Sequence, residues 1–323
     1  MLLKLWCRPD GSVKPAAADR SFCCFCGGDR RKPPEMLQNK ELRRGLAAYS
    51  RKCGPKHKIK RNTDYFCGMI LTDTHTHLYS EEFAADRAQM LERAMDAGVK
   101  RFFLPGIDSS CMEAMHALQE QYPDNIFLMA GLHPVYVKEN YEAELEQVRQ
   151  ALLRGSYVAV GEIGIDLYWD KSTLAWQQHA FREQIKLAKE HRLPINIHCR
   201  DAFDEIFEKL EAEQAADLRG IFHCFTGSYE QALRAIDCGM KLGIGGVVTF
   251  KNGKIDQFLH RIDIGHIVTE TDAPYLAPAP YRGKRNESAY IRLIASKLAE
   301  IYGLSLEEIA RITTKNAADV YGI

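Results

Sequence analysis

The chain has 323 residues and lacks any apolar run approaching the ~20 residues that a transmembrane helix needs. The short apolar stretch at residues 2–6 is interrupted by Lys4 and is too short for the core of a secretory signal. The sequence therefore predicts no membrane partner.

Cysteine is scarce after residue 68, where the chain has only Cys111, Cys199, Cys224 and Cys238. Four scattered thiols in a stretch of this length do not form the disulfide framework of a small secreted protein. We therefore predict a cytoplasmic protein. Cys199 and Cys224 each follow a histidine, and we expect both to be small buried groups rather than ligands.

Net charge is also absent, because 43 Lys and Arg residues balance 43 Asp and Glu residues. The balance is uneven along the chain. Residues 1–68 hold 16 basic and 6 acidic residues, whereas residues 69–323 hold 27 basic and 37 acidic residues. We infer two parts with different compositions, residues 1–68 and residues 69–323.

The basic N-terminal part alternates glycine and proline clusters with basic runs and shows no strand pattern. Its Cys23, Cys26, Cys53 and His57 could bind zinc, although the pairs lie further apart than in common zinc fingers. Its basic runs could instead hold nucleic acid. We favour a disordered or non-native extension, with Met69 as the true start.

The second part alternates short apolar runs with amphipathic segments. The runs predict strands at 70–77, 101–105, 126–132, 157–163, 194–198, 220–223, 240–245 and 266–271. Helices are expected at 84–97, 110–122, 141–153, 174–191, 202–213, 229–238, 255–261, 288–302 and 305–321. Eight strand–helix units of this length predict a (β/α)₈ TIM barrel of the α/β class. A doubly wound sheet is less favoured, since no glycine-rich phosphate loop follows the first run.

Metal-binding side chains gather where the expected strands end, which is where TIM barrels carry their chemistry. His75 and His77 are two residues apart, so on a strand they would share a face and could hold one cation. The alternative is a pair of core histidines, each of which would need a buried partner.

Four further strand ends carry the same kinds of side chain. Glu162 interrupts an apolar run, His198 and His223 occupy equivalent strand ends, and Asp272 lies two residues after Glu270. Each alone could be a satisfied core residue or half of a buried ion pair. Together, four histidines and two carboxylates suit two divalent cations: zinc, manganese, iron or, less well, magnesium.

The strings that carry these residues resemble the TatD family of metal-dependent deoxyribonucleases, within the amidohydrolase-like barrels, and most closely its YcfH branch. The matching segments are residues 72–77, 131–134, 161–166, 198–200, 223–227, 270–275 and 282–287. The resemblance covers residues 69–323, and residues 1–68 match nothing in the family. One departure is Ser288, where the family usually has proline.

The resemblance implies that His75, His77, Glu162 and Asp272 bind one metal ion. It also implies that Glu162 bridges to a second ion held by His198 and His223.

The reaction we expect is two-metal hydrolysis of a phosphodiester, with Asp272 and Glu162 as catalytic residues. His133, Arg200, Arg282 and Arg285 are candidates for substrate contact, since guanidinium binds phosphate oxygens in pairs. The acidic body argues against tight duplex binding. We therefore expect a monomer that acts on a strand end of nucleic acid, as a 3′–5′ exonuclease acting on DNA does.

Two alternatives remain at this stage. The same metals could hydrolyse another ester or an amide, for example the ester that joins an amino acid to transfer RNA. The chain could also be a non-catalytic metal-binding module, although a structural site would close its coordination and needs no second metal.

Overall fold

A computed structural model describes residues 68–213 and 217–323. The N-terminal part up to residue 67, with its candidate zinc ligands and basic runs, lies outside the described residues.

Eight parallel strands form one sheet in sequential order from β1 to β8. They are β1 Leu71–Asp73, β2 Val99–Pro105, β3 Ile126–Ala130, β4 Tyr157–Asp166, β5 Ile195–Arg200, β6 Gly220–Phe222, β7 Met240–Ile244 and β8 Ile267–Thr269. The first and last strands are joined by hydrogen bonds: Thr74 N–H donates to the Thr269 carbonyl at 3.1 Å, and the Thr269 hydroxyl donates to the Thr72 carbonyl at 3.1 Å. The sheet is the predicted (β/α)₈ barrel.

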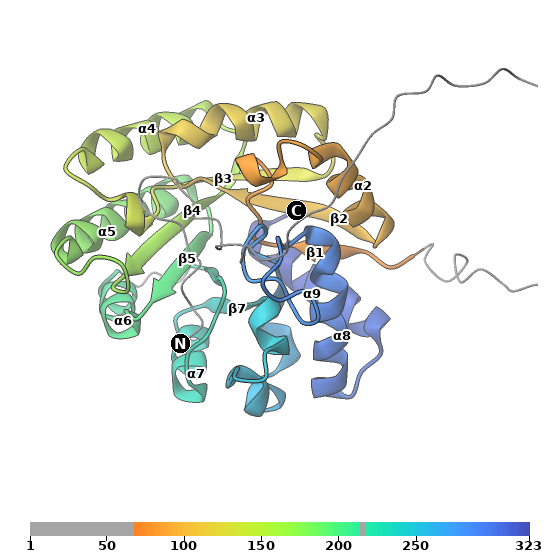
Figure 1. Ribbon diagram of the computed structural model, residues 1–323. Helices are drawn as coiled ribbons and strands as arrows, with labels where there is room; N and C mark the ends of the chain where they lie inside the picture. Colours follow the sequence, from red (N-terminus) through yellow and green to blue (C-terminus); the bar gives the residue numbers. More distant parts are fainter. Residues whose placement is uncertain (1–67, 214–216) are drawn as a thin grey trace, which may run out of the picture.

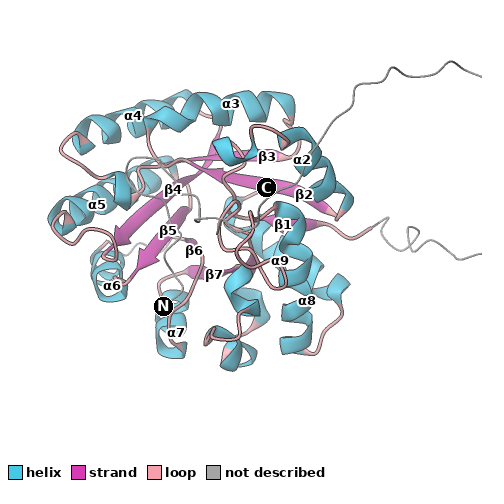
Figure 2. Cartoon of the chain, viewed as in Figure 1, coloured by secondary structure: helices cyan, strands magenta, loops and turns pink. Residues whose placement is uncertain are grey.

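Helices lie outside this ring of strands (Figures 1 and 2). They are α2 Arg87–Asp96, α3 Met112–Gln121, α4 Tyr141–Arg154, α5 Leu174–His191, α6 Phe203–Ala212, α7 Tyr229–Asp237, α8 Ile291–Tyr302 and α9 Leu306–Tyr321. Among the described residues, no helix is both long enough and apolar enough to cross a membrane.

Two layers of apolar side chains hold the barrel together, because alternate residues of a strand face opposite ways. On β2, Phe102 and Leu104 belong to the layer between strands and helices, whereas Phe103 points into the barrel. The interior layer contains Phe103, Met129, Ala159, Ile221 and Val268 from five strands, together with Ala317, Val320 and Tyr321 of α9.

Helix α9 thereby closes the end of the barrel opposite the strand ends. The ring of Tyr321 stacks on Phe103 with centroids 4.0 Å apart, and its hydroxyl donates to the Thr74 carbonyl at 3.3 Å. Among the described residues, side chains of α9 thus fill the barrel at the end opposite the carboxyl ends of the strands.

Several expected element boundaries were wrong, including the following three. The first strand ends at Asp73 rather than residue 77, because the chain then bends and Thr76 N–H bonds to the Phe103 carbonyl of β2. The fourth strand continues to Asp166, where it still pairs with β5. The short helix expected at 255–261 is instead two 3₁₀ turns, Ile255–Gln257 and Leu259–Arg261, separated by Phe258.

The contact between β5 and β6 leaves no room for a side chain at Gly220. A Cβ atom there would lie 2.1 Å from the Ile195 carbonyl oxygen, which belongs to the backbone and cannot move aside alone. We expect Gly220→Ala to lower the free energy of unfolding by about 1–3 kcal/mol, the usual cost of overpacking. Gly68→Ala, where a Cβ meets nothing within 4 Å, is the matched control. Chemical denaturation measures both, and equal stability of the two variants would contradict the expectation.

Candidate metal centre

Four side chains converge on one point at the open end of the barrel. The Nε2 atom of His75 lies 3.2 Å from Glu162 Oε2 and 3.7 Å from Asp272 Oδ1, and His77 Nε2 lies 3.7 Å and 3.4 Å from the same two oxygens. The two nitrogens are 3.3 Å apart. We call these four residues the first cluster. Its atoms are spaced as ligands around a single cation would be.

In His75 and His77 the Nδ1 atom, which points away from the first cluster, forms a hydrogen bond that leaves the Nε2 atom without a proton. His75 Nδ1 lies 2.8 Å from the Asn196 side-chain oxygen, which can only accept. The Tyr79 hydroxyl donates to the Pro105 carbonyl at 2.7 Å, so its oxygen accepts a hydrogen bond from the Nδ1–H group of His77, 2.8 Å away. Each neutral ring therefore presents an Nε2 lone pair to the first cluster, as a metal ligand must.

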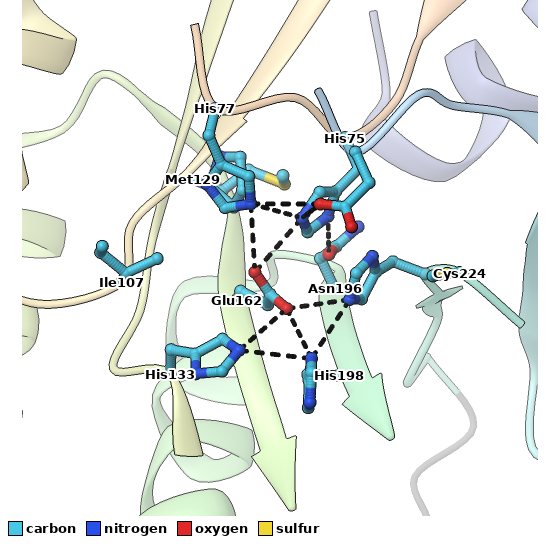
Figure 3. A network of polar contacts seen from close by, with 12 residues as sticks. His75, His77, Ile107, Met129, His133, Glu162, Asn196, His198 and Cys224 are labelled. Atoms are coloured by element: carbon cyan, nitrogen blue, oxygen red, sulfur yellow. Dashed lines mark hydrogen bonds and ion pairs between the residues drawn. The ribbon is translucent and has the colours of Figure 1, made fainter. Parts of the chain in front are cut away.

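The other oxygen of Glu162 faces a second group of histidines. Oε1 lies 2.8 Å from both His198 Nδ1 and His223 Nε2, and these two nitrogens are 3.4 Å apart. We call Glu162, His198 and His223 the second cluster. Figure 3 shows Glu162 between the two groups, with His75 and His77 on one side and His198 on the other.

His133 also reaches the second cluster, with Nε2 3.3 Å from Glu162 Oε1 and 3.3 Å from His198 Nδ1. Its Nδ1 accepts the backbone N–H of Val135 at 3.1 Å. A neutral ring must then carry its proton on Nε2. Burial lowers the pKa of His133, which favours this neutral form. His133 therefore presents a hydrogen-bond donor to the site, unlike His75 and His77.

Asp166 is a functional residue that the sequence reasoning missed. Its Oδ2 lies 2.9 Å from His198 Nε2, so it orients the ring that faces Glu162 through Nδ1. Burial alone would lower the pKa of His198, but hydrogen bonds to Asp166 and Glu162 raise it to about 9. Asp166 ends the string at 161–166 that carried the family resemblance, and this was the only signal for it.

Glu162 points into the barrel because β4 bulges at this position. Between Val160 and Ile163 the register against β5 shifts, so the strand does not alternate regularly. Gly161 permits the bulge, since a Cβ there would lie 2.6 Å from the Cβ of Asn196. Burial would raise the pKa of Glu162, but the neighbouring His223, His133 and His75 pull it well below its usual range. Glu162 is therefore a buried carboxylate in its charged form.

The residues present fit divalent cations. Among the described residues, neither carboxylate oxygen of Asp272 has a hydrogen-bond partner, although both are buried. A buried carboxylate without a partner is costly, and a cation beside it would offset that cost. Imidazole nitrogens and carboxylate oxygens are the donors that zinc, manganese and iron accept.

Glu270 and the neighbouring cysteines lie around the centre rather than in it. Glu270 accepts the backbone N–H of Cys224 and lies 3.7 Å from His223 Nδ1, behind the second cluster. Burial raises the pKa of Glu270 well above its usual range. Burial of the thiol groups likewise raises the pKa of Cys199 and Cys224, although both residues are partly rather than fully buried, unlike the small buried groups expected from the sequence.

The three arginines expected to bind substrate occupy different settings. Arg200 lies over the ring of Tyr168 at 3.8 Å from its centroid, at the end of β5. Arg282 is exposed and lies over Phe250 at 3.7 Å. Arg285 pairs with Asp86 at 2.6 Å and with Glu287 at 3.2 Å. Its charge is thus neutralised by two carboxylates, which gives it a structural contact that the sequence did not predict.

Comparison with known proteins agrees with this architecture. The family model described as TatD related DNase matches residues 72–322. The uncharacterized metal-dependent hydrolase YabD of Bacillus subtilis (strain 168) is 40% identical over 255 residues, which cover 79% of this chain and 100% of YabD. The uncharacterized metal-dependent hydrolase YcfH of Escherichia coli (strain K12) is 32% identical over 262 residues, covering 79% of this chain and 97% of YcfH.

Two further matches extend the comparison. A protein of Pantoea ananatis (strain LMG 20103) named 3′-5′ ssDNA/RNA exonuclease TatD is 31% identical over 257 residues, covering 78% of this chain and 99% of its own length. The crystal structure of the TatD homologue YjjV of Escherichia coli K12 superposes with a TM-score of 0.74 at 31% identity, covering 78% of this chain and 98% of YjjV. The chain therefore belongs to the TatD family of metal-dependent hydrolases.

Proposed function

We propose that the chain is a deoxyribonuclease of the 3′–5′ exonuclease type that hydrolyses phosphodiester bonds with two divalent cations. The observation that carries the proposal is the position of Glu162, whose Oε2 faces His75 and His77 and whose Oε1 faces His198 and His223. Phosphodiester hydrolysis is a reaction that uses two neighbouring cations.

The proposed ligands are His75, His77, Glu162 and Asp272 for one ion, and Glu162, His198 and His223 for the other. When bound, such ions lower the pKa of water and neutralise charge on the attacking and leaving oxygens. Glu162 would set the distance between the two positions, since one rigid carboxylate faces both.

Two further residues of the centre would handle protons. Asp272 has buried oxygens without hydrogen-bond partners and would orient the attacking water or accept its proton. His133 has its Nε2 proton directed into the site and would donate a hydrogen bond to an oxygen of the substrate.

The substrate class is supported by the relative that is named a 3′-5′ ssDNA/RNA exonuclease, which matches over nearly its whole length. It is also supported by the chemistry of the open end of the barrel. Arg200 lies at the end of β5, next to the second cluster, and could hold a phosphate oxygen.

The proposed ligands predict how metal affinity responds to substitution. Glu162→Gln and Asp272→Asn keep the side-chain shape but remove the charge. Loss of a residue that only hydrogen-bonds to a metal ligand costs about 10- to 100-fold in affinity, so we expect loss of a charged ligand to cost about 100-fold or more. Asn196→Ala, which frees the ring of His75, should cost about 10- to 100-fold. Calorimetric titration with Mn²⁺ or Zn²⁺ measures these affinities.

His116→Ala is the control for these titrations, because His116 lies on α3 and bonds to the Tyr157 hydroxyl at 2.9 Å, away from both clusters. It should bind metal as the wild type does. Wild-type affinity in Glu162→Gln would contradict the proposed bridging carboxylate.

The activity itself predicts a ladder of products. Incubated with Mg²⁺, Mn²⁺ or Zn²⁺, the wild type should shorten a 5′-labelled single-stranded DNA from its 3′ end and leave a circular single strand intact. His75→Ala should lose about 100-fold or more of this rate and chelation should abolish it, because both remove a cation that stabilises charge in the transition state. Gel electrophoresis of timed samples gives the rates.

Three results would revise the proposal. Cleavage of the circular strand would show an endonuclease rather than an exonuclease. Absence of any nucleotide release with all three metals, together with hydrolysis of an aminoacyl ester, would favour the other ester class. Metal binding without turnover of either substrate would indicate a binding module.

A further inference from the structure

Two exposed aromatic side chains, Tyr168 and Trp169, are neighbours on the described surface. Among the large apolar side chains exposed in residues 68–213 and 217–323, the aromatic ones are Tyr168, Trp169 and Trp176, with 42%, 36% and 40% of their surface accessible. Tyr168 and Trp169 follow the carboxyl end of β4, the strand that carries Glu162. They therefore stand at the open end of the barrel, where the two clusters lie.

Asp166 connects these two residues to the second cluster. One of its oxygens accepts the backbone N–H groups of Tyr168 at 2.9 Å and Trp169 at 3.2 Å, and the other lies 2.9 Å from His198 Nε2. The loop is fixed a second time, because Leu167 N–H donates to the Arg200 carbonyl at 2.9 Å. Both aromatic residues are thus held at a set position relative to a proposed metal ligand.

The rings and a neighbouring guanidinium form one surface. The rings of Tyr168 and Trp169 are perpendicular, with centroids 5.0 Å apart. The guanidinium of Arg200 lies 3.8 Å from the Tyr168 centroid and 5.6 Å from the Trp169 centroid. Aromatic faces combined with a positive charge are the groups on which proteins stack unpaired bases and hold their phosphates.

A group of phenylalanines near the strand ends has a different character. Phe203, Phe207, Phe222 and Phe225 contact one another between the sheet and α6, and Phe207 and Phe222 are fully buried. Their role is packing. Tyr168 and Trp169 instead keep about two fifths of their surface in water while their backbone is held by hydrogen bonds.

We propose that Tyr168, Trp169 and Arg200 form a stacking platform for an unpaired nucleobase of the substrate. The proposal rests on the nuclease function above and adds that the strand must be single near the bond that is cut. In a duplex the base faces are covered by neighbouring bases, so the platform would favour frayed or single-stranded ends.

The test compares two single-stranded oligodeoxynucleotides that differ only in whether the last four nucleotides at the 3′ end carry bases or are abasic. The wild type should cleave the abasic strand with at least about fivefold lower kcat/KM, the effect of losing one stacked base. Tyr168→Ala and Trp169→Ala should lose a similar factor on the normal strand, mainly through KM. On the abasic strand, the kcat/KM of either variant should stay close to that of the wild type, because the stacked base is already missing.

Trp176→Ala is the matched control, since Trp176 has the same exposure but stacks on Tyr141 of the outer helix α4, with centroids 6.1 Å apart. It should discriminate between the two strands as the wild type does. Because the substituted side chains are exposed, thermal unfolding of the variants should match the wild type, which separates a platform effect from misfolding.

The outcomes separate this proposal from the nuclease function. Equal cleavage of both strands by the wild type would overturn the platform and leave the nuclease intact. If neither strand were cleaved, the nuclease would fail, and fluorescence anisotropy of the same labelled strands without divalent metal would decide the platform. Weaker binding of the abasic strand by the wild type, but not by Trp169→Ala, would support it, and equal binding would overturn it.

Discussion

The centre depends on one buried charge, the carboxylate of Glu162. Burial disfavours an ionised carboxyl group by several kcal/mol unless opposite charge or hydrogen-bond donors surround it. Around Oε1 the barrel meets this requirement with His133, His198 and His223, and the neighbouring histidines draw the pKa of Glu162 well below its usual range. The Nε2 lone pairs of His75 and His77 face Oε2, where a bound cation would supply the opposite charge.

That group is placed by backbone geometry rather than by its own packing. A regular strand would turn successive side chains to alternate faces, but the bulge in β4 breaks the alternation at Gly161 and Glu162. Beyond the bulge β4 continues to Asp166, which pairs with Arg200 of β5. One strand thus supplies both the carboxylate between the clusters and the carboxylate that orients His198.

Much of the fold and of the centre could be predicted from the sequence. Apolar runs alternating with amphipathic segments indicated eight strand–helix units, and metal-binding residue types at strand ends indicated where chemistry would lie. The reason given for His75 and His77 was nevertheless wrong. They do not share a face of a strand, since β1 ends at Asp73. Instead Thr76 N–H bonds to Phe103 of β2 and His77 N–H bonds to Ala273, beyond the end of β8, and these contacts hold the segment that carries both rings.

The features that the sequence did not indicate all depend on partners distant along the chain. Asn196 orients His75 across 121 positions, and Asp86 neutralises Arg285 across 199 positions. The proton position on His133 follows from a local bond to Val135, but only the fold shows where that proton points. Pattern analysis finds residue types, whereas roles such as donor, acceptor or ion-pair partner follow from the assembled neighbours.

The side chains of α9 that fill one end of the barrel determine from which side substrate and product can reach the centre. Among the described residues, Tyr321 stacked on Phe103 fills the far end of the barrel, and the centre lies at the carboxyl ends of the strands. A polymer therefore cannot pass through the barrel from one end to the other. Substrate and product would enter and leave at the same end. Under the proposed nuclease function, a released fragment and the remaining strand would therefore share this side of the barrel.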